Sequence, residues 1–152
     1  MRTTLFSAKA EYACIAMLEL AAQYSDPQPV RLKAIADAHR IPARFLVQIL
    51  LQLKAAGLFI STRGAAGGYV LARSPEQITL ADIIGVIDRS EPSDRPADKV
   101  PKIEKMPETP AVLSVRAVWK EVEAAQRRIL SDTSLAELVR RSQESFALSY
   151  SI

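Results

Sequence analysis

The sequence has one cysteine, Cys14, and one histidine, His39, in 152 residues. A lone cysteine forms no disulfide within its own chain, and a structural zinc site needs about four Cys or His ligands. Nothing in the sequence around either residue indicates a Cys–His nucleophile pair. We therefore expect no metal site. Composition alone leaves open an enzyme that uses carboxylates, but no nucleophile–base pair or metal set supports one, so no enzymatic activity is expected.

Long hydrophobic runs are also missing. No uninterrupted apolar stretch approaches the roughly 18 residues that span a bilayer. The apolar N-terminal stretch contains Lys9, Glu11 and Glu19, and it lacks the apolar core of a signal peptide. These absences predict a cytoplasmic protein without a membrane segment.

The net charge of +3 is small but unevenly distributed. Residues 1–75 contain nine Lys and Arg against four Asp and Glu, whereas residues 76–152 contain eleven against thirteen. Positive charge gathered in one part of a chain favours a polyanionic partner for that part. The first half is therefore the half in which to look for a polyanion-binding site.

Three helices are predicted in this basic half, over 8–24, 33–39 and 42–56, from apolar residues at helical spacing. The first helix has a stripe expected to be buried, formed by Cys14, Met17, Leu18 and Ala21. In the third helix, Pro42 suits the first helical position and Gly57 suits the end. The short turn between the second and third helices predicts a helix-turn-helix.

Two short β-like runs follow, over 58–61 and 69–72, and the loop between them holds three of the five glycines. A hairpin directly after a helix-turn-helix is a wing. A further helix is predicted from Thr79 to Asp88, with Asp82 placed to complete a capping box. The expected fold is mainly α with a small β-hairpin: a winged helix-turn-helix over residues 1–89.

The second half divides in two. Residues 90–110 hold five of the nine prolines and nine charged residues, which predicts a flexible loop without regular structure. Residues 111–152 are expected to form dimerisation helices, a long one over 111–131 and a last one to about 148. The long helix has an apolar stripe that a partner chain would cover, at Val115, Val118, Trp119, Val122 and Ile129.

Several segments resemble one known family, the winged-helix transcriptional regulators that include IscR, NsrR and CymR. The resemblance covers nearly the whole chain except 90–110, and its most specific part is the Arg-Gly-x-x-Gly-Gly-Tyr wing. The segments are Lys-x-x-Tyr-Ala from Lys9, IPARFLVQILLQLKAAGL at 41–58, STRGAAGGYVLAR at 61–73, ITLADIIGVID at 78–88, and the Trp119 helix followed by SLAELV at 134–139. The resemblance implies a dimeric, DNA-binding repressor or activator.

In such a protein the helix at 42–56 would enter the major groove. Arg44 and Gln48 share one face and can both make bidentate base contacts, with Pro42 and Ala43 beside them at the helix start. Family members often carry a glutamate at the position matching Val47, so the preferred DNA sequence should differ here. The alternative for Arg44 and Gln48 is that they are ordinary solvated residues.

The wing is expected to contact the minor groove through Arg63, while Gly64, Gly67 and Gly68 let the backbone approach DNA without a Cβ clash. A second group of cations could contact phosphates or could equally be ordinary solvated side chains. This group consists of Arg2, Lys9, Lys33, Arg40 and Lys54.

Cluster-binding relatives place three cysteines within the segment matching 90–110, because iron needs thiolate ligands held on a short loop. This chain has none there, so we expect a member of the cluster-free branch, with no iron–sulfur cofactor. Cys14 is expected to be structural, since a buried thiol has a raised pKa and little reactivity; a redox switch is the alternative.

The sequence therefore predicts a sequence-specific DNA-binding regulator, a repressor acting as a homodimer on a pseudo-palindromic site. The alternative is a protein-interaction module that keeps the fold and has lost specific DNA binding. The signal is left open between a small molecule, a partner protein docking on 90–110, and no effector. Trp119 is expected in the core or the dimer interface, with the wall of a small-molecule pocket as an alternative.

Overall fold

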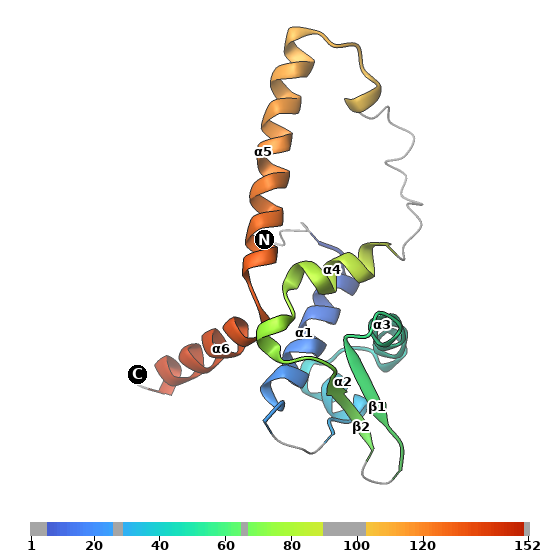
Figure 1. Cartoon of the computed structure of the whole chain (residues 1–152). Coiled ribbons are helices and arrows are strands. Elements are labelled where there is room, and N and C mark those ends of the chain that lie inside the picture. Colours follow the sequence, from blue (N-terminus) through green and yellow to red (C-terminus); the bar gives the residue numbers. More distant parts are fainter. Residues whose placement is uncertain (1–5, 26–28, 65–66, 90–102, 151–152) are drawn as a thin grey trace.

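A computed structural model of the chain describes residues 6–25, 29–64, 67–89 and 103–150, and it is mainly helical with one two-stranded hairpin (Figure 1). The expected fold class is confirmed. The elements in chain order are α1 (Ala8–Ala22), α2 (Leu32–His39), α3 (Ala43–Ala55), β1 (Phe59–Thr62), β2 (Gly68–Leu71), the 3₁₀ turn η1 (Pro75–Gln77), α4 (Leu80–Arg89), the 3₁₀ turn η3 (Ile103–Lys105), α5 (Pro110–Asp132) and α6 (Leu135–Tyr150).

Helix α1 lies at the centre of the body and packs against α3, α4, α6 and β2. Of the residues expected on its buried stripe, Met17 and Ala21 are buried, whereas Cys14 and Leu18 are only half-buried. The buried face is broader than one stripe because α1 has neighbours on several sides. It is lined mostly by small side chains, which let those neighbours approach closely: Ala10, Ala13, Ala16, Met17, Leu20 and Ala21.

Helices α2 and α3 form the predicted helix-turn-helix. Arg40 ends α2 in the left-handed conformation, with φ of 52°. Pro42 precedes α3 as its N-cap and is not its first helical residue, because its ψ of 124° is not helical; its carbonyl accepts from the Leu46 N–H at 3.1 Å. Gly57 follows α3 with φ of 77°, the left-handed conformation that a glycine commonly adopts just after a helix end.

The hairpin pairs β1 with β2 in antiparallel register, from Phe59 opposite Leu71 to Thr62 opposite Gly68. Val30 adds a bridge to Tyr69, with N–H to carbonyl distances of 3.0 and 2.7 Å. The Phe59 and Tyr69 rings meet edge to face with centroids 5.3 Å apart. The base of the wing is therefore anchored to the segment that precedes α2.

Helix α6 is attached to this body. The Leu80 N–H donates to the Thr133 carbonyl at 3.0 Å, and the Leu135 N–H donates to the Ile78 carbonyl at 2.9 Å. Leu135 is fully buried, and α6 packs on α1 and η1. The segment 111–152, expected to form dimerisation helices, thus contains one helix that is part of the winged body and one that leaves it.

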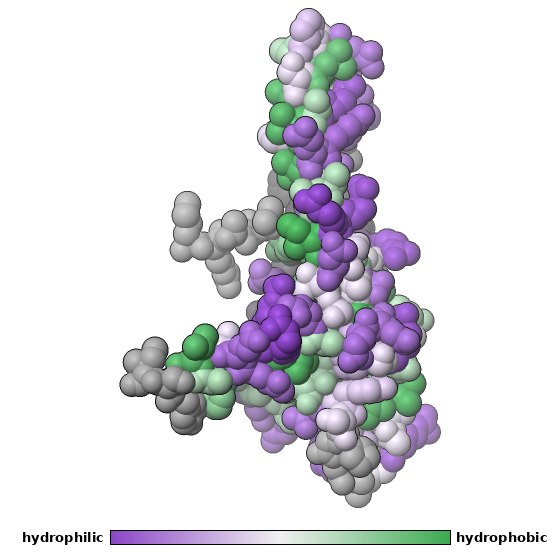
Figure 2. Space-filling view, turned by 60° about the vertical axis from the view of Figure 1, so that its left-hand side comes forward, coloured by the Kyte–Doolittle hydropathy of each residue, from purple (hydrophilic) through white to green (hydrophobic). Residues whose placement is uncertain are grey.

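The helix that leaves is α5. It has 23 residues, none of them buried, and it stands away from the body (Figure 1). Trp119 is 52% exposed, so it is not in the core of this chain. Apolar patches run up α5 among hydrophilic ones (Figure 2).

Residues 90–110 were expected to form a loop without regular structure. Within them, Ile103–Lys105 form the 3₁₀ turn η3, and α5 begins at Pro110. Residues 90–102 lie outside the described part of the chain.

None of the helices in the described ranges combines the length and apolar character needed to cross a bilayer.

Shortening a side chain to alanine should affect stability very differently on the two faces of α3. Leu53 is fully buried, and Leu51, two residues earlier, is 62% exposed. Leu53→Ala should lower the free energy of unfolding by about 2–5 kcal/mol, because it leaves a cavity. Leu51→Ala should change it by no more than about 0.5 kcal/mol. Urea unfolding followed by circular dichroism measures both, and equal losses would contradict the orientation of α3.

Candidate nucleic-acid interface

One face of α3 is buried and the opposite face is open. Leu46, Ile49 and Leu53 are fully buried in the core. A row on the solvent side follows helical spacing and consists of Arg44, Val47, Gln48 and Leu51. Arg44 and Gln48 thus lie on one exposed face near the start of α3, where a recognition helix meets base edges.

A hollow of about 500 Å³ lies between the start of α1 and the start of α3. Lys9, an expected phosphate contact, lies in this hollow together with Pro42 and Gln48, which are expected at the major groove. Its lining residues are Ser7, Ala8, Lys9, Tyr12, Pro42, Phe45 and Gln48. Sequence reasoning missed this hollow, since helical periodicity does not report how two helix starts approach each other.

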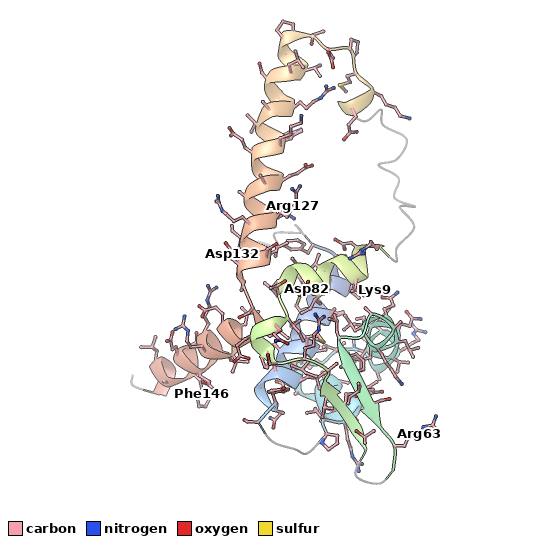
Figure 3. All side chains as sticks on the ribbon, in the orientation of Figure 1. Lys9, Arg63, Asp82, Arg127, Asp132 and Phe146 are labelled. Atoms are coloured by element: carbon pink, nitrogen blue, oxygen red, sulfur yellow. The ribbon has the colours of Figure 1, made fainter. Side chains whose placement is uncertain are left out.

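Arg63 is exposed and projects outward from the hairpin (Figure 3). Of the three wing glycines, Gly64 has a positive φ, of 109°. A Cβ on Gly67 would lie 2.3 Å from the Thr62 carbonyl oxygen, and one on Gly68 would lie 2.6 Å from the Val30 oxygen. The fold therefore requires Gly67 and Gly68 for close packing within the chain, before any DNA contact is considered.

The remaining expected phosphate contacts are spread over the body. Lys33 and Arg40 are exposed on α2 and in the turn after it. Lys54 is exposed at the end of α3 and donates to the Ser61 hydroxyl at 2.7 Å. Arg2 lies outside the described residues. Contact of these side chains with phosphate stays a prediction.

Cys14 lies in the wall of an apolar cavity of about 360 Å³ between α1, α4, the base of α5 and α6. Burial, together with the nearby carboxylates of Glu11 and Asp88, raises the pKa of its thiol to about 11. The raised pKa agrees with the structural role expected for Cys14. A thiol in this environment carries very little reactive thiolate at neutral pH.

Comparisons with known proteins agree on one family. A family model described as "Rrf2: Iron-dependent Transcriptional regulator" matches residues 6–141. The HTH-type transcriptional regulator CymR of Bacillus subtilis is 36% identical over 132 residues, which cover 87% of this chain and 87% of that protein.

Solved structures give the same result. The structure of CymR, "the Global Cysteine Regulator of B. subtilis", aligns with a TM-score of 0.73 and 34% identity, covering 93% of this chain and 98% of that one. IscR of T. potens aligns with a TM-score of 0.73 and 31% identity, covering 92% and 89%. These relatives are transcriptional regulators and not enzymes.

The family description names iron, and the donor atoms of this chain do not fit an iron–sulfur cluster. Clusters are held by several thiolates, whereas Cys14 is the one cysteine in the sequence and its thiol is kept protonated by burial. The one histidine, His39, lies 2.8 Å from the Glu19 carboxylate on the surface. Within the described residues, no three His, Cys, Asp or Glu side chains are grouped as a metal site would need.

The environment of Cys14 predicts slow alkylation. At pH 8 the native thiol should react with iodoacetamide about 100-fold more slowly than the same thiol in urea, because the pKa is raised from 9.0 to about 11. Mass spectrometry of timed samples measures both rates. Equal rates in the native and unfolded protein would favour the redox-switch alternative for Cys14.

Proposed function

Because the chain belongs to the Rrf2 family of transcriptional regulators and is itself a DNA-binding regulator, we propose that it acts in the cytoplasm as a homodimeric repressor without an iron–sulfur cluster. The observation that carries this proposal is the arrangement of two exposed surfaces. Helix α3 and Arg63 of the wing lie on the same side of the body, and α5 extends away from the body (Figures 1 and 3).

The homodimer is supported by the composition of α5. The apolar stripe from Val115 to Ile129 extends over about 21 Å of this 23-residue helix, and an apolar stripe of that length is seldom left open to water. Val115, Val118 and Val122 follow one another at spacings of three and four, Ile129 lies seven residues further on the same face, and all four are exposed. A second copy of α5 covers this stripe in the proposed dimer.

Two-fold symmetry then dictates the form of the DNA site. A symmetric dimer presents two identical α3 helices, so its operator is a pseudo-palindrome. Successive major grooves on one side of B-DNA are about 34 Å apart, which sets the spacing of the two helices in the complex. Repression follows when such a dimer occupies a promoter and excludes the polymerase.

The cluster-free part of the proposal is supported by the single thiol and its raised pKa. We place the binding site of a small-molecule effector in the cavity beside Cys14. This cavity has an apolar lining and lies at the base of α5. A ligand held there contacts both the winged body and the dimerisation helix, and so it is placed to change the spacing of the two α3 helices.

DNA binding is tested by mobility shifts on genomic fragments of the source organism at several salt concentrations. Wild type should select specific fragments, with affinity falling steeply as salt rises because phosphate contacts release counterions. Gln48→Ala and Arg63→Ala should each weaken specific binding by about 1–3 kcal/mol.

Arg127→Ala is the matched control, since Arg127 is exposed on α5, away from α3 and the wing (Figure 3). It removes the same charge as Arg63→Ala and should leave affinity almost unchanged. If wild type prefers no fragment over nonspecific DNA, the chain is the protein-interaction module considered as the alternative.

The dimer is tested with a charge placed on the stripe. Val122→Glu should weaken dimerisation by at least about 100-fold, because a carboxylate would be buried without a partner. Sedimentation equilibrium measures the dimer dissociation constant. Ala117→Glu puts the same charge on an exposed position about 140° around α5 and should leave the dimer intact. A monomeric wild type, or equal effects of the two variants, would contradict the proposed interface.

A further inference from the structure

We propose that Val47 recognises the 5-methyl group of a thymine in each half of the operator. This inference rests on the proposed DNA binding by α3 and names one base feature that this helix reads. It makes Val47 a specificity-determining residue beside Arg44 and Gln48.

The starting observation is the composition of the exposed row on α3. Two of its four members are large and apolar: Val47 is 44% exposed and Leu51 is 62% exposed. Both stand on a helix whose other face already fills the core with Leu46, Ile49 and Leu53. No other described part of the chain covers this row. Exposed apolar side chains grouped with base-reading polar ones indicate a surface that is buried on binding.

The helical geometry places Val47 within the reading surface. Val47 follows Arg44 by three residues and precedes Gln48 by one, so it lies less than one turn from Arg44. Val47 and Gln48 are about 1.5 Å apart along the axis and about 100° apart around it. Val47 and Gln48 therefore lie on either side of the line from Arg44 to Leu51, at nearly the same position along the helix axis.

The other exposed apolar residues of α3 have different positions. Phe45 lines the hollow beside Lys9 and Tyr12, and its ring centroid lies 5.5 Å from the Arg44 guanidinium carbon. Leu51 is one turn further from the helix start, toward Lys54, which is hydrogen-bonded to Ser61. The first turns of a recognition helix meet the base edges, so Val47 is the better placed of these residues.

The chemistry of the major groove selects the ligand. Thymine is the one unmodified base with a methyl group on its major-groove edge. A valine side chain has no donor or acceptor, and it gains free energy by covering that methyl group. Cytosine at the same place would turn its N4 amino donor toward a side chain that cannot accept. Val47 therefore favours thymine and disfavours cytosine.

The experiment removes the methyl group without changing base pairing. Wild-type protein first selects its operator from a random duplex pool. Each thymine is then replaced by deoxyuridine, symmetrically in both half-sites, and dissociation constants are measured by fluorescence anisotropy at fixed salt. At one symmetric position, wild type should lose about fourfold per half-site, or about 15-fold for the dimer, as expected for one lost methyl contact.

A matched variant separates Val47 from effects of uracil on the DNA itself. Val47→Ala should bind the thymine site more weakly than wild type does, and it should lose almost nothing further on the uracil site. Leu51→Ala should keep the full thymine-to-uracil difference. In wild type, 5-methylcytosine paired with guanine at that position should bind more tightly than unmodified cytosine, because the methyl group is restored.

Several results would overturn the inference while leaving specific DNA binding in place. These are an operator insensitive to every uracil replacement, the same sensitivity in Val47→Ala as in wild type, or a sensitivity abolished by Leu51→Ala instead. Failure to select any operator is a different outcome: it would remove the proposed function together with this inference.

Discussion

The interface depends on the packing of the inner face of α3 into the core around α1. Leu46, Ile49 and Leu53 are fully buried there, and this fixes the rotation of α3 about its own axis. Because helical residues three and four apart share a face, the same packing turns Arg44 and Gln48 outward. Small side chains on α1 allow this packing to be close. The orientation of the candidate reading surface is therefore a consequence of core packing and needs no contact of its own.

The molecule separates its two candidate binding surfaces. The winged body, to which α6 also belongs, buries nearly all of the core, whereas α5 has no buried residue. The paired hydrogen bonds between the segments around Ile78 and Leu135 hold the α5–α6 junction against the start of α4. The base of α5 and the cavity beside Cys14 are thus attached to the same body that carries α3.

The wing shows that one residue pattern can serve the fold and the function together. Its glycines suggested close approach to DNA, yet Gly67 and Gly68 are already required because a Cβ would collide with backbone oxygens of Thr62 and Val30. Gly64 differs, since its positive φ shapes the turn and a Cβ there would meet nothing within 4 Å. Arg63, beside it, is exposed and open to a partner.

Apolar periodicity and turn chemistry were enough to predict the helix-turn-helix, the hairpin and the long α5, because these depend on residues close together in the chain. The absence of an iron–sulfur cluster, argued from the single cysteine, stays a prediction. Three features could not be predicted in this way: the hollow between α1 and α3, the burial of α1 by neighbours on several sides, and the attachment of α6 to the body. They arise from contacts between segments far apart in the chain, and local spacing carries no information about which buried faces meet.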